Sequence, residues 1–116
     1  MEAKELMIGD KVMVKVLSQI PDTYVLHTWT ANDYSRDIQI KPITLTHEIL
    51  EENEWWFNVE DEWMHFEVNF TIEKFNGRFQ CYDINQIKID SVHELQHALR
   101  LCGLNELADN FKVYEE

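Results

Sequence analysis

Alternating apolar and polar residues predict a strand-rich unit at the start of the chain. Residues 12–16 place valine at every second position, a period of two that indicates a half-buried β-strand. Residues 24–30 and 36–40 predict two further strands, with a loop tip at Asn32–Asp33 between them. Three short strands joined by tight turns predict a small curled sheet that resembles an SH3-like half-barrel.

The same alternation predicts a second set of strands in the middle of the chain. Strands are expected over residues 55–59, over one long run from 63 to 75, and over residues 79–82 and 86–89. Asn76-Gly77 lies between two alternating runs, which is the strongest short signal for a two-residue hairpin turn. That turn predicts two cross-strand pairs: Ile72 opposite Cys81, and Lys74 opposite Phe79.

Helices are expected where a cap precedes an apolar stripe. Thr46 is a good N-cap for a short helix, and residues 90–102 carry apolar side chains at helical spacing. The stripe consists of Val92, Leu95, Leu99 and Cys102, widened by Ala98 and Leu101. Gly103 is the expected left-handed residue after this helix, with Leu104 closing a Schellman motif. Residues 105–111 predict one more short amphipathic segment.

These elements predict a single α+β domain spanning residues 1–116. Residues 1–42 form its three-stranded, SH3-like N-terminal unit, and residues 43–116 contain a short helix and an antiparallel sheet packed by the C-terminal helix. No linker rich in Gly, Ser or Pro divides the chain. A chain of this size buries roughly two-thirds of its unfolded surface, so we expect it to fold without a metal or a disulfide.

The charge balance changes which partners are expected. The chain has 22 acidic and 10 basic residues, a formal net charge of -12, which argues against nucleic acid because its binders neutralise phosphates with basic side chains. Residues 42–73 contain no Lys or Arg. Their acidic residues are Glu48, Glu51, Glu52, Glu54, Glu60, Asp61, Glu62, Glu67 and Glu73. This segment indicates a solubilising face or an acidic face for a basic protein, including one that imitates nucleic-acid phosphates.

The cysteines and the apolar runs indicate the cellular environment in which we expect the protein. Cys81 and Cys102 have no CxxC neighbour, so we expect both to be reduced and buried, and no Cys/His spacing indicates zinc. No apolar run is long enough to span a membrane, and the first residues lack an apolar secretion segment. We therefore expect a cytoplasmic protein without a membrane partner or a cofactor.

Residues 93–97 read H-E-x-x-H on the predicted C-terminal helix, which is the pattern of zinc peptidases. In those enzymes two histidines one turn apart bind the metal and the glutamate is the general base. A third ligand is missing here, because Arg100 and Gly103 stand where one such family has glycine and histidine. Ser91 and Glu94 also fit a capping box, which explains the glutamate without catalysis.

The position of the two histidines on the helix also argues against a zinc-peptidase site. His93, His97 and Arg100 lie off the apolar stripe, so we expect all three to face solvent. A zinc-peptidase helix is instead buried in a larger enzyme with two lobes. The H-E-x-x-H match is therefore interpreted as a surface feature and not as a metal site.

Three segments together carry a resemblance. They read L-x-I-G-x-x-V at residues 6–12, I-x-P-I-x-L-T-x-E-I-L at residues 40–50, and V-H-x-L-Q-H-A-L-R-L-C-G at residues 92–103. In this order they are similar to small uncharacterised proteins of Bacteroidales genomes, prophages and mobile elements. The resemblance implies no activity and no catalytic residue, and similar sequences often lack a glutamate at the position of Glu94.

The resulting hypothesis is a small acidic accessory factor that binds a protein with a basic surface and is not an enzyme. Four tryptophans are many for this length, and one or two of them are candidates for exposed interface anchors. The candidate partner-binding residues are Glu51, Glu52, Glu54, Trp55, Glu60, Asp61 and Glu62.

Two other classes of function remain open at this point. The first is a zinc-dependent hydrolase using His93, Glu94 and His97. The second is a nucleic-acid accessory module acting through basic residues of the N-terminal unit, namely Lys11, Lys15, Arg36 and Lys41.

Overall fold

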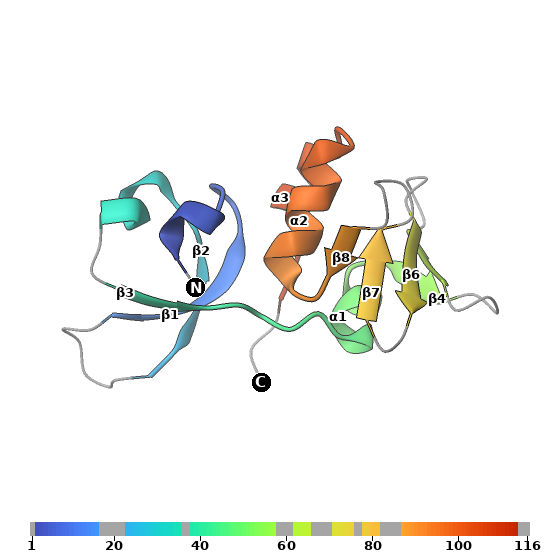
Figure 1. Cartoon of the computed structure of the whole chain (residues 1–116), viewed down its shortest axis with the longest axis horizontal. Coiled ribbons are helices and arrows are strands. Elements are labelled where there is room, and N and C mark those ends of the chain that lie inside the picture. Colours follow the sequence, from blue (N-terminus) through green and yellow to red (C-terminus); the bar gives the residue numbers. More distant parts are fainter. Residues whose placement is uncertain are drawn as a thin grey trace.

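Two antiparallel sheets and several short helices make up the described structure. A computed structural model describes residues 2–16, 23–35, 38–57, 62–65, 71–75, 78–81 and 87–113. Helices α2 (Val92–Leu101) and α3 (Asn105–Asp109) lie between the two sheets (Figure 1). The molecule is elongated, with extents of 47 × 28 × 24 Å. The α+β class expected from the sequence is confirmed.

The N-terminal sheet has the strand order β2-β1-β3 and is antiparallel throughout. Its strands are β1 (Lys11–Val16), β2 (Val25–Thr28) and β3 (Ile38–Lys41). Alternation along β1 sends one set of side chains inward, as the sequence predicts, and the core of this unit consists of Leu6, Val12, Val14 and Trp29. The three-stranded antiparallel sheet is confirmed, whereas its likeness to an SH3-like half-barrel stays a prediction.

Two 3-10 helices, η1 (Ala3–Glu5) and η2 (Ala31–Ser35), flank this sheet. Asp33 was expected at a loop tip, but it lies in η2 and is buried. Its Oδ2 atom accepts hydrogen bonds from the backbone and the hydroxyl of Thr30 and lies 2.7 Å from Nε2 of His27. A short aspartate side chain that returns to nearby backbone folds the segment inward, which explains the difference.

The second sheet has five strands in the order β4-β5-β6-β7-β8. They are β4 (Trp55–Phe57), β5 (Glu62–His65), β6 (Thr71–Phe75), β7 (Arg78–Cys81) and β8 (Ile87–Ile89). The register of β6 and β7 places Ile72 opposite Cys81 and Lys74 opposite Phe79. Both pairs expected from the Asn-Gly signal are confirmed.

One long strand over residues 63–75 is wrong, because β5 and β6 are separate and pair antiparallel. Trp63 lies opposite Ile72 in that pair. The pair puts an odd-numbered residue of β5 and an even-numbered residue of β6 on the same face of the sheet, so the period of two changes phase between the strands. The alternation misleads because it does not show where the chain reverses.

Helix α1 (His47–Glu52) begins as predicted, since the Oγ1 atom of Thr46 accepts a hydrogen bond from the Ile49 amide at 3.2 Å. The Schellman end of α2 is also confirmed. Gly103 has φ +78°, and the Leu104 amide donates to the Leu99 carbonyl at 2.9 Å. The Thr46 cap thus sets where α1 begins, and Gly103 sets where α2 ends.

The larger hydrophobic core lies between the five-stranded sheet and the helices. It consists of Leu45, Leu50, Trp55, Ile72, Ile89, Val92, Leu95, Ala98, Leu99, Ala108 and Phe111. The predicted stripe of α2 is thus confirmed up to Leu99. Cys102 and Leu101 are exposed instead, which corrects the expected burial of that cysteine and the expected width of the stripe. The side chain of Cys81 lies outside the described part.

Candidate functional site

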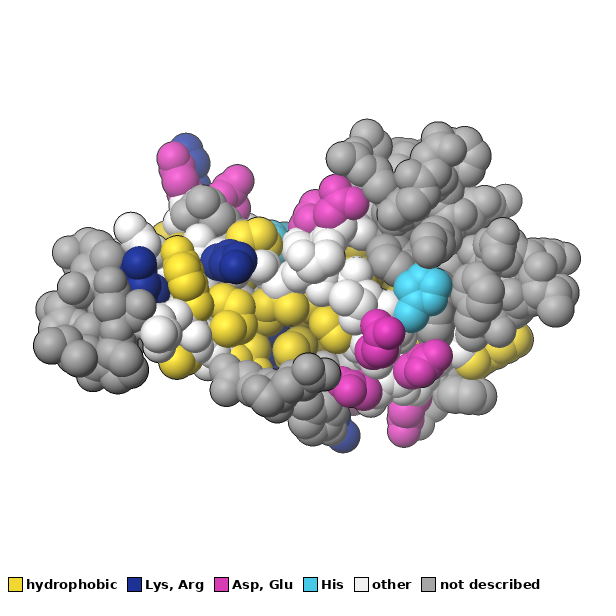
Figure 2. All heavy atoms as spheres, turned by 90° about the horizontal axis from the view of Figure 1, so that it is seen from below, with side chains coloured by type: hydrophobic (Ala, Val, Ile, Leu, Met, Phe, Trp, Pro, Cys, Tyr) yellow, Lys and Arg dark blue, Asp and Glu magenta, His cyan; other side chains and the backbone are white. Residues whose placement is uncertain are grey.

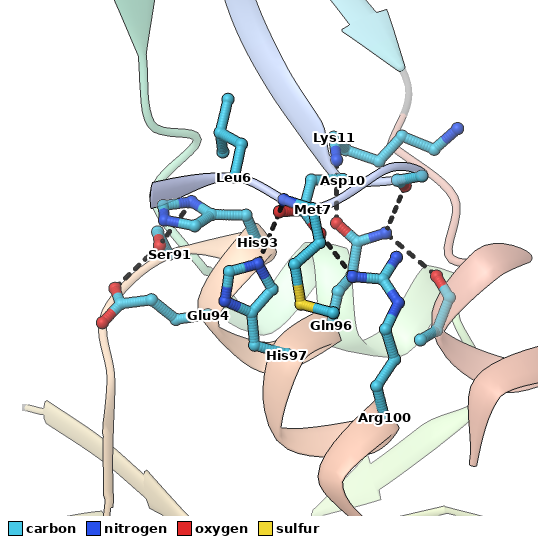
Figure 3. A network of polar contacts seen from close by, with 12 residues as sticks. Leu6, Met7, Asp10, Lys11, Ser91, His93, Glu94, Gln96, His97 and Arg100 are labelled. Atoms are coloured by element: carbon cyan, nitrogen blue, oxygen red, sulfur yellow. Dashed lines mark hydrogen bonds and ion pairs between the residues drawn. The ribbon is translucent and has the colours of Figure 1, made fainter. Parts of the chain in front are cut away.

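The H-E-x-x-H segment lies in the first turns of α2, and its polar side chains face the N-terminal unit (Figure 3). His93 and Gln96 are buried, and the side chains of His97 and Arg100 are only 27% and 10% exposed. The expectation that His93, His97 and Arg100 face solvent is therefore wrong. This polar face of the helix is covered by the turn Met7–Asp10, which we call the docking turn.

Asp10 is the centre of this contact and is fully buried. Its Oδ1 atom accepts a hydrogen bond from Nη1 of Arg100 at 2.6 Å. Its Oδ2 atom accepts from the Met7 amide at 2.8 Å and lies 2.5 Å from Nε2 of His97. Because the carboxylate is met by hydrogen-bond donors and one fixed cation, the ionised form of Asp10 is stabilised where it is buried.

The pKa values of two groups reflect this environment. Burial raises the pKa of Asp10, but the hydrogen bonds from His97, the Met7 amide and Arg100 outweigh it, and the pKa lies below its usual value. Burial lowers the pKa of His93, against the opposing charge of Asp10. The contact therefore joins a charged aspartate and a histidine that is neutral near neutral pH.

Gln96 links three parts of the chain through one side chain. Its Nε2 atom donates to the carbonyls of Gly9 and Ala108, each at 2.9 Å, and its Oε1 atom accepts from the Lys11 amide at 2.8 Å. The amide is completely buried and its hydrogen-bonding groups are used. Gln96 thus fastens the docking turn and the start of β1 to α2 and α3.

Ser91 begins α2 without the predicted capping box. Its hydroxyl makes no cap bond to the helix backbone; it donates to Oε1 of Glu94 at 2.7 Å and lies 3.0 Å from Nδ1 of His93. The capping box is wrong because the serine pairs with the glutamate side chain instead of the backbone. The arrangement is not a catalytic triad either, since the carboxylate binds the hydroxyl and does not orient the imidazole.

A metal site does not fit these residues. The part of the chain that the structure describes contains no group of three His, Cys, Asp or Glu side chains able to hold a metal ion. Nδ1 of His93 faces Ser91, and Nε2 of His97 faces Asp10. The H-E-x-x-H pattern therefore serves the contact between α2 and the docking turn, and it gives the hydrolase hypothesis no ligand set.

A second site is a cavity of about 500 Å³ between the end of α1 and the α2–α3 turn. We call it the acidic groove; it is lined by Glu52, Asn53, Glu54, Gly103, Leu104, Asn105, Glu106, Leu107, Asn110 and Lys112. The Asn53 side chain holds its two sides together. Its Nδ2 atom donates to the Ile49 and Lys112 carbonyls, and its Oδ1 atom accepts from the Lys112 amide.

The predicted partner-binding residues are divided by the structure. Glu51, Glu52 and Glu54 are exposed, and the latter two line the acidic groove. Trp55 is a core residue, which rules it out as an exposed anchor, whereas its neighbour Trp56 is 39% exposed. Glu60, Asp61 and the side chain of Glu62 lie outside the described residues.

The basic residues proposed for nucleic acid lie on the N-terminal sheet. Lys11 and Lys15 are in β1 and Lys41 ends β3, so the sheet brings them to neighbouring strands. Arg36 lies outside the described residues.

Sequence reasoning missed the groups that complete both sites. Asp10 is far from α2 in sequence and carried no signal beyond its place in a Gly-Asp turn. Glu106 belongs to a short helix whose apolar face alone was recognised. Contacts between residues so far apart in the sequence become visible only when the fold places the distant segments together.

Comparison of the chain with protein-family models, with curated proteins and with solved structures gives no match. Within the described residues, every helix is too short or too polar to cross a lipid bilayer.

Proposed function

We propose that this chain is a non-enzymatic accessory protein that binds a partner protein through its acidic groove. Glu54 carries the proposal. It has φ +67°, a left-handed conformation that a residue with a Cβ atom adopts at a cost. The position directly follows Asn53, the C-cap of α1, where glycine is the ordinary choice. The glutamate at this position contributes a carboxylate to the lining of the groove, and such backbone strain clusters at functional positions.

The chemistry of the groove suits a lysine or arginine side chain. Glu52, Glu54 and Glu106 supply carboxylates for the cationic head. Leu104 and Leu107 are half-buried in the same lining and can cover the aliphatic stem of such a side chain. A partner with a basic surface is therefore the class that this groove would accept.

The surroundings of the groove support the same partner. Glu48 and Glu51 are exposed on α1, and Asp and Glu side chains gather beside a histidine at this end of the molecule (Figure 2). Like charges around a cleft raise the rate at which an oppositely charged partner arrives. Trp56, partly exposed on the edge strand β4, is a candidate anchor of the kind enriched at binding hot spots.

The proposal also includes the kind of gene that encodes the protein and its cellular location. The resemblance to small proteins of Bacteroidales genomes and prophages supports a gene carried by a phage or mobile element. A cytoplasmic location is part of the same proposal.

Replacing Glu54 by glycine separates binding from folding. We expect Glu54→Gly to raise the free energy of unfolding by about 1 kcal/mol, because the left-handed strain is relieved. The same change should weaken the binding of a labelled arginine-rich peptide several-fold, since one carboxylate is lost. Fluorescence anisotropy measures the binding, and denaturant unfolding measures the stability.

Two further variants complete the test. Glu54→Gln should lose the same affinity without the gain in stability, because it keeps the Cβ atom and removes only the charge. Glu2→Gln removes one exposed charge at the far end of the chain and should leave binding nearly unchanged. Equal affinity for the peptide in all four proteins would overturn the proposal.

A further inference from the structure

A second cavity lies beside the docking turn and has a volume of about 720 Å³. Its apolar walls are Met7 and Ile8 from that turn and Leu101 from the end of α2. Ile8 and Leu101 are 61% and 72% exposed, the highest values among the large apolar side chains of the described residues. Apolar side chains exposed around a hollow are typical of a binding site. We call this cavity the apolar pocket; its polar lining consists of His97, Arg100, Asn105 and Asp109.

The apolar pocket and the acidic groove adjoin each other at α3. Asn105 lines both cavities. Asp109, one turn further along α3, lines the apolar pocket, whereas Glu106 and Asn110 line the groove. All four side chains are exposed, so the outward face of α3 forms a ridge between the two cavities. The approach to this ridge is open at Gly103, where a Cβ atom would meet nothing within 4 Å.

The two cavities differ in the side chain that they suit. The groove contains carboxylates for a basic group, whereas Arg100 lies in the wall of the apolar pocket. Arg100 pairs there with Asp10 at 2.6 Å and with Asp109 at 3.3 Å. Because this cation already meets both carboxylates, a second basic side chain would gain little in the pocket. An apolar side chain gains by leaving water, so it is the better occupant.

We propose that the apolar pocket receives a large apolar side chain of the same partner protein that places a basic side chain in the acidic groove. This inference rests on the proposed function and adds the second half of the recognised segment. The exposed amides of Asn105 and Asn110 can donate to and accept from the backbone of an extended segment that crosses the ridge. A small apolar molecule is a poorer fit, because it would leave the ridge and the groove unused.

The size of the ridge sets the spacing of the two side chains in the partner. A helix is about 10 Å across, and an extended chain advances about 3.3 Å per residue. Side chains on the same side of an extended chain lie an even number of residues apart. The basic and the apolar side chain are therefore expected about four residues apart.

Two labelled peptides test this proposal on the whole chain, with fluorescence anisotropy as the readout. Each peptide has a central run of arginines, and the fourth residue beyond that run on each side is leucine in one peptide and serine in the other. We expect the wild-type protein to bind the leucine peptide about fivefold to tenfold more tightly, because only leucine fills the apolar pocket. Leu101→Ser and Ile8→Ser should each remove most of this preference and leave the affinity for the serine peptide unchanged.

Val25→Ser is the matched control, because Val25 is 50% exposed on β2 and does not line the apolar pocket. This variant should keep the preference for leucine. Equal losses in Val25→Ser and Leu101→Ser would mean that the leucine peptide binds exposed apolar surface in general, which would overturn the proposal. Equal affinity of the wild-type protein for the two peptides would overturn it as well.

Glu54→Gln distinguishes the failure of this inference from the failure of the proposed function. It should weaken the binding of both peptides to the same extent, because it removes a charge from the groove and leaves the apolar pocket unchanged. If it does so while the wild-type protein does not distinguish leucine from serine, the groove stands and the apolar pocket fails. If it weakens the binding of neither peptide, the proposed function fails, and this inference fails with it.

A second copy of the chain is the other occupant to test. Each copy has a formal net charge of -12, and such charge opposes self-association, so we expect a monomer in sedimentation equilibrium. A dimer that Leu101→Ser dissociates would assign the apolar pocket to a second copy and would overturn the proposal.

Discussion

His93 and Asp10 are ionisable residues buried within one contact, and one is neutral while the other is ionised. His93 is neutral because burial disfavours its imidazolium. Asp10 is ionised because His97, Arg100 and the Met7 amide meet its carboxylate. Both folded-state pKa values lie below those of the unfolded chain, so protonation favours unfolding in each case.

The contribution of His93 makes stability depend on mild acid. Above the unfolded value of 6.5 the imidazole is neutral in both states, and its effect on stability is absent. As the pH falls below 6.5, the unfolded chain binds the proton more readily and the free energy of unfolding decreases. We expect this loss between about pH 7 and about pH 5 in urea unfolding experiments. Asp10 adds a further loss below 3.8.

His93→Gln is the control for that pH dependence. Glutamine keeps a polar side chain near Ser91 but does not titrate, so the variant should lose less stability on acidification than the wild type. Parallel stability curves for the two proteins over this range would show that His93 is not responsible.

The sequence could place the apolar residues of α2 but not the environment of its polar ones. Val92, Leu95 and Leu99 are buried as helical spacing predicts. His93 and Gln96 are buried too, because a polar face can be covered by polar groups that satisfy it. Periodicity identifies what avoids water, and it cannot identify a matching surface elsewhere in the chain.

At the scale of elements, the docking turn depends on a close approach to α2. Gly9 has φ +95°, and a Cβ atom there would lie 2.9 Å from Nη2 of Arg100 and 3.0 Å from Oδ1 of Asp109. Gly103, after α2, has φ +78° with nothing within 4 Å of its would-be Cβ atom. The two glycines share backbone strain but differ in contact with neighbours.

Alanine substitutions at these glycines separate the two effects. We expect Gly103→Ala to cost about 1–2 kcal/mol from the left-handed backbone alone. Gly9→Ala should cost at least about 1 kcal/mol more, because it also displaces Arg100 from its ion pairs. Denaturant unfolding of both variants measures the difference. Equal destabilisation would mean that the docking turn does not need to approach the helix so closely.

Elements with local signals were predicted best. Thr46 caps α1, Gly103 ends α2, and the Asn-Gly signal gave the β6–β7 register, all from neighbouring residues. The long strand over residues 63–75 failed because alternation does not reveal where a chain reverses. The acidic groove could not be predicted as a cavity, because residues 52–54 and 103–112 meet only in the fold.

At the scale of the whole molecule, one helix serves two units. The apolar face of α2 belongs to the core under the five-stranded sheet, and its polar face holds the docking turn of the N-terminal unit. The acidic groove is lined by other residues and does not use the buried polar groups of this joint. The central claim is therefore that the polar face of α2 holds the N-terminal unit against the rest of the molecule.

A double-mutant cycle with Asp10→Asn and Arg100→Gln measures that claim most directly, with the free energy of unfolding as the readout. We expect each single change to cost about 2–3 kcal/mol and the pair to be coupled by at least about 1 kcal/mol, in one cooperative transition. Additive costs near zero, or an N-terminal sheet that unfolds separately in the wild type, would contradict it.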